Sequence, residues 1–201
     1  IAIAVAGACL VSFLCYQIGA AFFNLDYRHS YGYIGAMLFV IPGFPFITSG
    51  LDMSKLDLRS GVERLTYAVL VIAIATSSGW GVAMLLDLQP GNMLKLNISI
   101  NQMIGLRLLA SFWGVFGFSL MFNSKLSMAT AAAVIGALSN TMRLSLVDYA
   151  HLPAALAAFL GALLAGLLAF RLKNLVGFPR IAITVPSIVI MVPGLYLYRA
   201  V

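Results

Sequence analysis

The chain has 201 residues, of which 62% are hydrophobic and only 9% are charged. A water-soluble domain carries roughly a quarter charged residues, so this composition excludes a soluble fold. The formal net charge is +6, but the basic residues stand singly between apolar runs and do not alternate with aromatic residues, so we expect no nucleic-acid partner.

Apolar runs along the whole chain reach the roughly 20 residues that a helix needs to cross a bilayer. They predict an all-α, polytopic integral membrane protein of which about seven transmembrane helices are visible. The expected spans are Ala2–Phe23, Tyr33–Gly50, Val62–Leu86, Ile104–Phe122, Leu126–Val147, Pro153–Phe170 and Ile181–Tyr198. The chain begins and ends beside apolar runs without a polar tail, from which we expect a fragment or one subunit of a larger membrane complex.

The second expected span contains a helix-breaking stretch with Pro42, Gly43 and Pro45. Proline removes a backbone donor and clashes with the preceding turn, and in hydrocarbon such a break is tolerated where the backbone lines a cavity or is buried by other helices. The first amides after a break are partly positive and can hold an anionic group without a basic side chain. Thr48 and Ser49 follow and can add hydroxyl contacts.

The last expected span repeats the break at Pro193-Gly194. This pair lies five spans after Pro42-Gly43, and an odd offset gives the two spans opposite orientations in the membrane. Such a pattern is the signature of an inverted repeat of two five-helix halves, although two unrelated helix ends would produce it too. In a repeat, residues 1–86 would hold the last helices of the first half, 87–103 the connecting loop, and 104–201 the second half without its last helix.

The distribution of basic residues predicts the orientation, because lysine and arginine accumulate in cytoplasmic loops. The connections after the second, fourth and sixth spans hold Lys55, Arg59, Arg64, Lys125, Arg171, Lys173 and Arg180. The opposite connections and the end of the chain hold Arg28, Lys95, Arg143 and Arg199, with Arg107 just inside the fourth span. We therefore expect the first set in the cytoplasm and the protein in the plasma (inner) membrane.

The sixth span is rich in small residues at a spacing of four. Two such rows run side by side: Ala154, Ala158, Ala162 and Gly166, and Ala157, Gly161, Ala165 and Ala169. A neighbouring helix can approach this face closely. Tight packing accounts for the pattern, and a sliding or rocking surface would use the same residues.

Motifs of enzymatic chemistry are absent from the sequence. It contains no zinc-binding, phosphate-loop, dinucleotide or nucleophilic-serine motif. Cys9 and Cys15 are six residues apart and point to different faces of one expected helix, which disfavours a disulfide or a metal pair. We expect no enzymatic activity, no cofactor and no metal site.

Polar residues inside the expected spans are costly in a bilayer and are therefore candidates for a transport pathway. Asn140 and Arg143 are three residues apart and share a helix face, where the arginine can meet a carboxylate. Arg143 also lies near the end of its span, so it can equally extend to the outer interface. Asn101, Gln102 and Arg107 at the start of the fourth span fit a role as interfacial caps.

Asp52 follows the broken stretch at the expected cytoplasmic mouth. A carboxylate there can exchange a proton with the cell interior, which makes Asp52 the candidate for proton coupling. The same residue can instead cap the segment Met53–Val62, since aspartate is favoured at the start of a helix.

Two ordered motifs resemble those of a known family. Val40-Ile41-Pro42-Gly43-Phe44-Pro45, followed by Leu51-Asp52, Gly61 and Arg64-Leu65, resembles the end of the first half of the threonine/serine exporter family. Val185-Pro186-Ser187-Ile188-Val189, with Val192-Pro193-Gly194 and Tyr198-Arg199, resembles the closing motif of its second half. The resemblance implies export of threonine and serine driven by the proton gradient, and some split-gene relatives are associated with dicarboxylates such as succinate.

We therefore expect a secondary transporter that exports a small carboxylate-bearing substrate by proton antiport and alternating access. The candidate substrate-binding or gating residues are Pro42, Gly43, Pro45, Thr48, Asn140, Arg143, Pro186, Pro193 and Gly194, and Asp52 is the proton-coupling candidate. The expected partners are the substrate, protons, the lipid bilayer and a partner subunit or a second copy of the chain. A dicarboxylate exporter, one subunit of a split-gene complex and an uncoupled channel are the alternatives.

Overall fold

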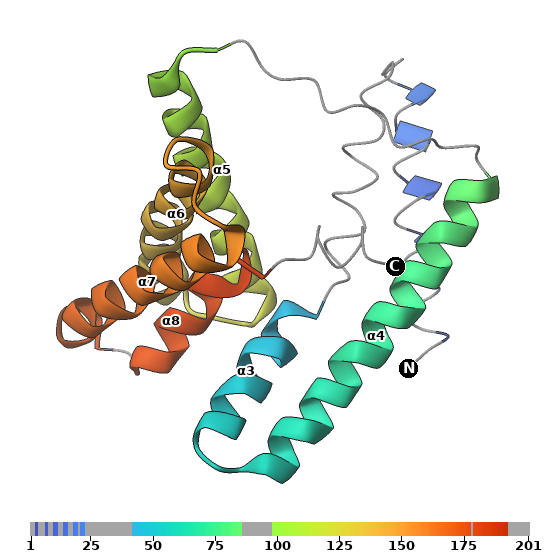
Figure 1. Cartoon of the computed structure of the whole chain (residues 1–201), viewed down its shortest axis with the longest axis horizontal. Helices are drawn as coiled ribbons and strands as arrows, with labels where there is room; N and C mark the ends of the chain where they lie inside the picture. The colour runs from blue at the N-terminus through green and yellow to red at the C-terminus, as the bar shows by residue number, and fades with distance from the viewer. Residues whose placement is uncertain are drawn as a thin grey trace. The chain divides into compact units, whose positions relative to one another are not determined.

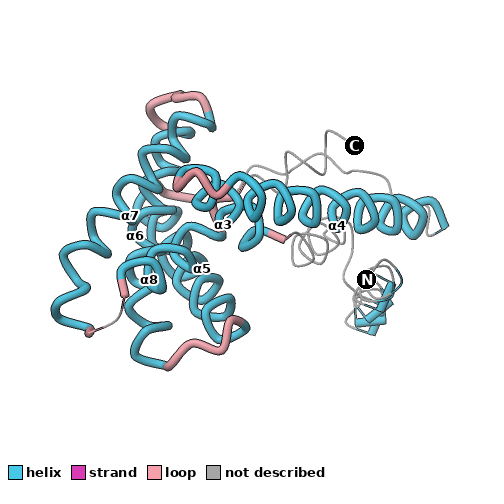
Figure 2. The backbone as a smooth tube through the Cα atoms, turned by 90° about the horizontal axis from the view of Figure 1, so that it is seen from below, coloured by secondary structure: helices cyan, strands magenta, loops and turns pink. Residues whose placement is uncertain are grey.

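The computed structural model describes residues 42–85, 98–177 and 179–192, together with isolated helical positions between Ile3 and Phe22. The chain divides into two compact units, Ile1–Lys95 with Pro193–Val201 and Leu96–Val192, and each is described by itself. Among the described residues every regular element is a helix (Figure 1, Figure 2). The all-helical class expected from the sequence is thereby confirmed for the described residues, whereas the total of seven spans and the inverted repeat stay predictions.

In the first unit, α3 (Gly43–Ser54) and α4 (Leu58–Leu85) form a helical hairpin. Leu56 turns the chain with a positive φ of 64°. The carboxylate of Asp57 then accepts a hydrogen bond from the amide of Ser60 at 3.3 Å and caps the start of α4. A Cβ atom on Gly61 would lie 2.6 Å from Cγ of Met53, so the hairpin depends on the missing side chain for its close crossing.

These bounds locate the break and correct one alternative of the sequence analysis. Pro42 precedes α3 as its N-cap, and Pro45 occupies the first turn of this helix, where the missing N–H is tolerated. Asp52 does not cap a helix over Met53–Val62, since it lies in the last turn of α3 and α4 begins later, behind Asp57.

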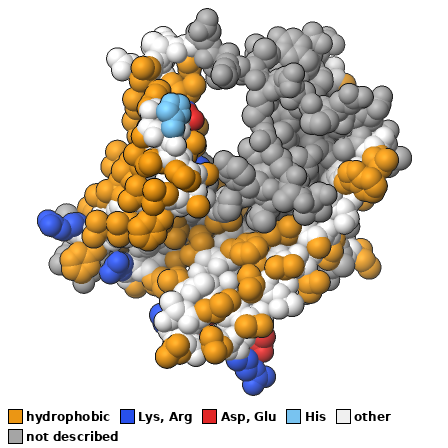
Figure 3. All heavy atoms as spheres, in the orientation of Figure 1, with side chains coloured by type: hydrophobic (Ala, Val, Ile, Leu, Met, Phe, Trp, Pro, Cys, Tyr) orange, Lys and Arg blue, Asp and Glu red, His pale blue; other side chains and the backbone are white. Residues whose placement is uncertain are grey.

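The second unit is a bundle of three long helices and one short helix: α5 (Ile100–Met121), α6 (Leu126–Asp148), α7 (Ala154–Val176) and α8 (Arg180–Val189). Three stretches of the described chain are long and apolar enough to cross a membrane, and they lie in α5, α6 and α7. Hydrophobic side chains cover most of the visible face of this unit (Figure 3). A surface of this kind matches hydrocarbon rather than water.

Helix α6 is the central element of the second unit and packs against α5, α7 and α8. It is rich in alanine, and Ala129, Ala132 and Ala133 are completely buried. At Gly136 a Cβ atom would lie 2.6 Å from Cγ2 of Val115 and 3.0 Å from the carbonyl oxygen of Ser187. The small residues therefore permit three neighbours to pack closely around one helix.

The predicted small-residue face of α7 is confirmed for one of its two rows. Ala157, Ala165 and Ala169 are fully buried. Gly161 would place a Cβ atom 3.2 Å from the carbonyl oxygen of Ser139 on α6. The other row is mostly half-buried, so α7 uses one narrow stripe, rather than a broad face, to approach α6.

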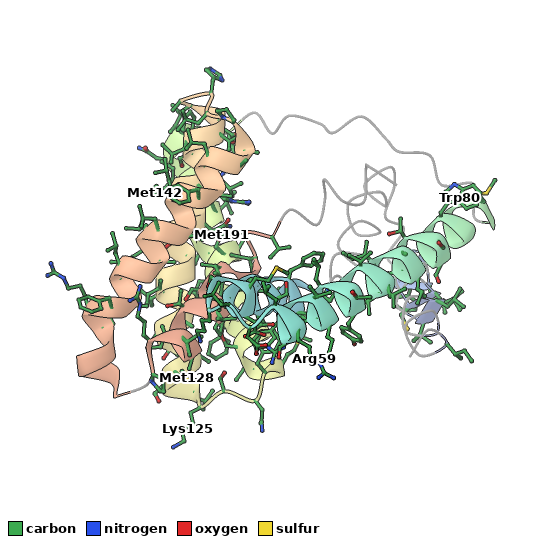
Figure 4. All side chains as sticks on the ribbon, turned by 60° about the horizontal axis from the view of Figure 1, so that its bottom comes forward. Arg59, Trp80, Lys125, Met128, Met142 and Met191 are labelled. Carbon is green, nitrogen blue, oxygen red and sulfur yellow. The ribbon has the colours of Figure 1, made fainter. Side chains whose placement is uncertain are left out.

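The up-and-down order of the helices collects basic residues at one end of the second unit. The turn between α5 and α6, the last turns of α7 and the start of α8 carry Lys125, Arg171, Lys173 and Arg180. Figure 4 shows Lys125 at this end, whereas Met191 lies within the length of the bundle. We call this the basic end; at the opposite end α6 finishes at Asp148.

Candidate functional site

A cluster of polar side chains lies inside the second unit at the centre of α6. Ser139, Asn140 and Thr141 are consecutive, and each is at most 7% exposed. The side-chain nitrogen Nδ2 of Asn140 donates a hydrogen bond to the hydroxyl oxygen of Ser111 on α5 at 2.9 Å. Within the described residues, the Asn140 carbonyl oxygen and the hydroxyls of Ser139 and Thr141 have no hydrogen-bond partner. Burying a polar group without a hydrogen-bond partner costs free energy. The unpaired groups of the cluster can therefore accept or donate further hydrogen bonds.

Arg143 lies one turn beyond Asn140 and reaches the carboxyl end of α8. Its guanidinium Nη1 donates to the carbonyl oxygen of Met191 at 3.3 Å. The last carbonyls of a helix lack intrahelical partners and carry partial negative charge, which favours a cation there. The sequence analysis offered two roles for Arg143, contact with a carboxylate or extension to the outer interface. The structure adds a third, because the guanidinium contacts the backbone shortly before Pro193.

The short helix α8 ends well before it could cross a bilayer. Its ten residues extend about 15 Å at 1.5 Å per residue, roughly half of a 30 Å hydrocarbon core. Pro186 lies inside the helix and is buried. The hydroxyl of Ser187 has two acceptors for its one hydrogen: the carbonyl of Ile183 in the same helix at 2.8 Å and the carbonyl of Ala132 on α6 at 3.0 Å.

Helix α7 also borders the Arg143 site, through Gly161. A Cβ atom on Gly161 would lie 3.2 Å from Cβ of Arg143 and 3.2 Å from the sulfur of Met191. Helices α6, α7 and α8 therefore meet around Arg143, while α5 contacts the neighbouring Asn140 through Ser111. The structure brings Asn140, Arg143 and the end of α8 together as one candidate site.

The first unit holds the other candidates. Thr48 donates its hydroxyl hydrogen to the backbone carbonyls of Phe44 and Pro45, at 3.0 and 3.2 Å, so its oxygen remains as an acceptor. The first four backbone N–H groups of a helix usually have no hydrogen-bond partner within the helix. At the start of α3 only two of these four positions carry an N–H, because Pro42 and Pro45 have none. This reduces the anion-binding capacity expected at the break.

A shallow groove of about 350 Å³ lies between the start of α3 and the first turns of α4. Its lining residues are Phe44, Pro45, Thr48, Glu63, Arg64 and Tyr67. Next to it, Nε of Arg64 lies 3.2 Å from a carboxylate oxygen of Asp52, whose side chain is 22% exposed. Asp52 therefore has an ionic partner, and its part in proton coupling stays a prediction.

A second ion pair was not anticipated from the sequence. Arg107 on α5 bonds through Nη2 to the carboxylate of Asp148, the last residue of α6. The expected caps nearby are found in part, because Ser99 and Gln102 form a reciprocal capping box at the start of α5. No local pattern in the sequence indicates this ion pair, because its partners are 41 residues apart and lie on different helices.

Two candidates, Pro193 and Gly194, lie outside the described residues. The candidates of the first unit and those of the second are described separately. Within the described ranges, no group of three or more histidine, cysteine or acidic side chains is placed to hold a metal ion.

Comparisons with known proteins test the resemblance. A family model described as a putative threonine/serine exporter matches residues 1–87, and one described as threonine/serine exporter, ThrE, matches residues 107–201. No curated protein and no solved structure matches the chain. The two matches follow one another in order and together cover nearly the whole sequence. The chain thus belongs to the threonine/serine exporter family, a family of membrane transport proteins.

Proposed function

We propose that the chain exports threonine and serine across the plasma (inner) membrane by proton antiport through alternating access. The observation that carries this proposal is the meeting of Arg143, Asn140 and the carboxyl end of α8. A free amino acid offers a carboxylate, an ammonium group and, in serine and threonine, a hydroxyl. A guanidinium, an amide oxygen and helix-end carbonyls are the complementary groups.

Half-length helices support placement of this site near the middle of the membrane. Helix α3 has 12 residues and starts after Pro42, whereas α8 has ten and ends before Pro193. They extend about 18 and 15 Å, which is roughly half of the hydrocarbon thickness in each case. Interrupted helices are the elements at which inverted-repeat transporters bind substrates. The division between the two family matches supports a first half before residue 87 and a second half after residue 107.

Efflux from proteoliposomes tests the proposal. Vesicles that contain the purified protein are loaded with labelled threonine at neutral pH and diluted into acidic buffer. We expect efflux that saturates with threonine concentration and accelerates with the imposed pH gradient. Linear, gradient-independent efflux would identify a channel, and release of succinate without threonine would identify a dicarboxylate exporter.

A parallel preparation tests whether the chain functions alone. The protein is purified with and without the product of any neighbouring membrane-protein gene. Efflux that requires the second product would identify one subunit of a split transporter, and efflux from the chain alone would exclude that requirement.

A further inference from the structure

The ion pair between Arg107 and Asp148 connects α5 and α6 at the end of the second unit opposite to the basic end. The Arg107 side chain is 14% exposed, whereas that of Asp148 is 47% exposed. The arginine is therefore mostly enclosed by protein, and the carboxylate remains open to the surroundings. Solvent protons have access to one partner and little access to the other.

Asp148 stands in an unfavourable place within its own helix. It is the last residue of α6, at the negative end of the helix dipole, whereas Arg107 lies beyond the first turn of α5. Arrangements that give up such stability are concentrated at functional sites.

In the part of the second unit that the structure describes, few other ionisable groups accompany Asp148. Its own segment continues with Tyr149 and His151, and Arg143 precedes it on α6. Helix α5 carries no charge except Arg107. The charged residues of the other packed helices lie at the basic end: Arg171 and Lys173 on α7, and Arg180 on α8. Asp148 is the only acidic residue in the sequence between Leu96 and Val192.

We propose that Asp148 is the carboxylate that accepts the incoming proton during transport, and that Arg107 is the cation released by this protonation. The inference rests on the proposed antiport and deepens it. A proton from the outer solution bonds to a carboxylate oxygen of Asp148 and removes its negative charge. The neutral acid no longer balances Arg107, so the contact between α5 and α6 loosens at this end. Loss of the proton restores the carboxylate and the ion pair.

This assignment complements the proton-coupling candidate of the first unit. Asp52 pairs with Arg64, and the expected orientation places this pair on the cytoplasmic side. An exporter that takes up protons from outside needs an acceptor on the outer side. In the second unit, whose sequence contains a single acidic residue, Asp148 can meet that requirement.

Two flux modes separate proton coupling from substrate handling. Threonine–threonine exchange at equal pH needs no net proton movement, whereas efflux into acidic buffer does. In Asp148→Asn we expect exchange to persist and stimulation by the pH gradient to be lost. Arg107→Gln keeps the carboxylate but removes the cation that protonation releases, so we expect stimulation to be reduced while exchange persists. Asp57→Asn, which removes an exposed carboxylate but keeps the side-chain oxygen that accepts the hydrogen bond from the amide of Ser60, serves as the matched control and should behave like wild type.

The outcomes distinguish this inference from the proposed function. Wild-type protein that performs neither mode would contradict the proposed function itself. If the wild type is active and Asp148→Asn keeps the full stimulation by the pH gradient, the assignment of Asp148 is wrong, whereas the proposed function stands. Equal loss of both modes in Asp148→Asn and Arg107→Gln would also overturn it, because the ion pair would then be purely structural. His151→Gln, measured in parallel, should retain the dependence of efflux on the pH gradient. If that dependence is lost in His151→Gln, the histidine and not Asp148 accepts the proton.

Discussion

Arg143 illustrates how a single half-buried cation can hold an interrupted helix. Its guanidinium donates to the carbonyl of Met191, where the chain leaves α8 and approaches Pro193. The charge balances the negative end of α8, and Arg143 lies one turn along α6 from Asn140 of the polar cluster. A residue placed in this way can contact a substrate carboxylate and respond to movement of the broken segment.

Replacement of Arg143 tests this role. A hydrogen bond to a charged group contributes about 1.5–3 kcal/mol, so we expect Arg143→Gln to reduce threonine efflux by roughly tenfold or more. Arg143→Lys keeps the charge without the planar fork and should retain part of the activity. Arg59→Gln, at a side chain that is 91% exposed, is the control. Wild-type efflux in Arg143→Gln would remove this residue from the site.

At the scale of the element, the first turn of α3 combines a buried glycine with two prolines. Gly43 is buried, whereas a Cβ atom on Gly50 in the same helix would meet nothing within 4 Å. We expect Gly43→Leu to abolish transport while membrane insertion persists, because the added bulk blocks close approach at the break. Gly50→Leu should transport normally. Efflux and membrane yield of the two variants measure the difference, and normal efflux in both would make the break an ordinary helix start.

The crossing of α5, α6 and α8 at Gly136 offers a test of packing. In Gly136→Ala the new methyl group meets Val115 and the backbone of Ser187. Overpacking of this kind costs about 1–3 kcal/mol, so the variant should unfold at a lower temperature in detergent. Gly117→Ala on α5 adds the same methyl group to open space and should leave the melting temperature unchanged or slightly raised. Equal melting temperatures would show that α6 is not tightly packed there.

Sequence reasoning predicted the long helices well, because each apolar run is a local signal. The bounds of α6 differ from the expected span only at Asp148. The polar contacts could not be predicted from the sequence, because Asn140 and Ser111 are 29 residues apart and Arg107 and Asp148 are 41 residues apart. No periodicity encodes such pairings. The position of α8's end was indicated by Pro193-Gly194, but its contact with Arg143 depends on how four helices pack.

At the scale of the whole molecule, the orientation in the membrane follows from charge. The basic end of the second unit carries Lys125, and the opposite connection carries the exposed Ala150. In a chain with Cys9 and Cys15 replaced by alanine, we expect Ala150→Cys to react with an impermeant thiol reagent on intact cells. Lys125→Cys should react only after the membrane is permeabilised. The reverse pattern would place the basic end outside and contradict the proposed direction of proton entry.

The central claim is that substrate export and proton entry are one coupled process. Proteoliposomes that contain a pH-sensitive dye and a high internal concentration of threonine, with equal pH on both sides, test it most directly. Threonine that leaves by antiport must draw protons inward, so the lumen should acidify, and the acidification should stop when threonine is present at equal concentration outside. Threonine efflux with no change in luminal pH would contradict the account.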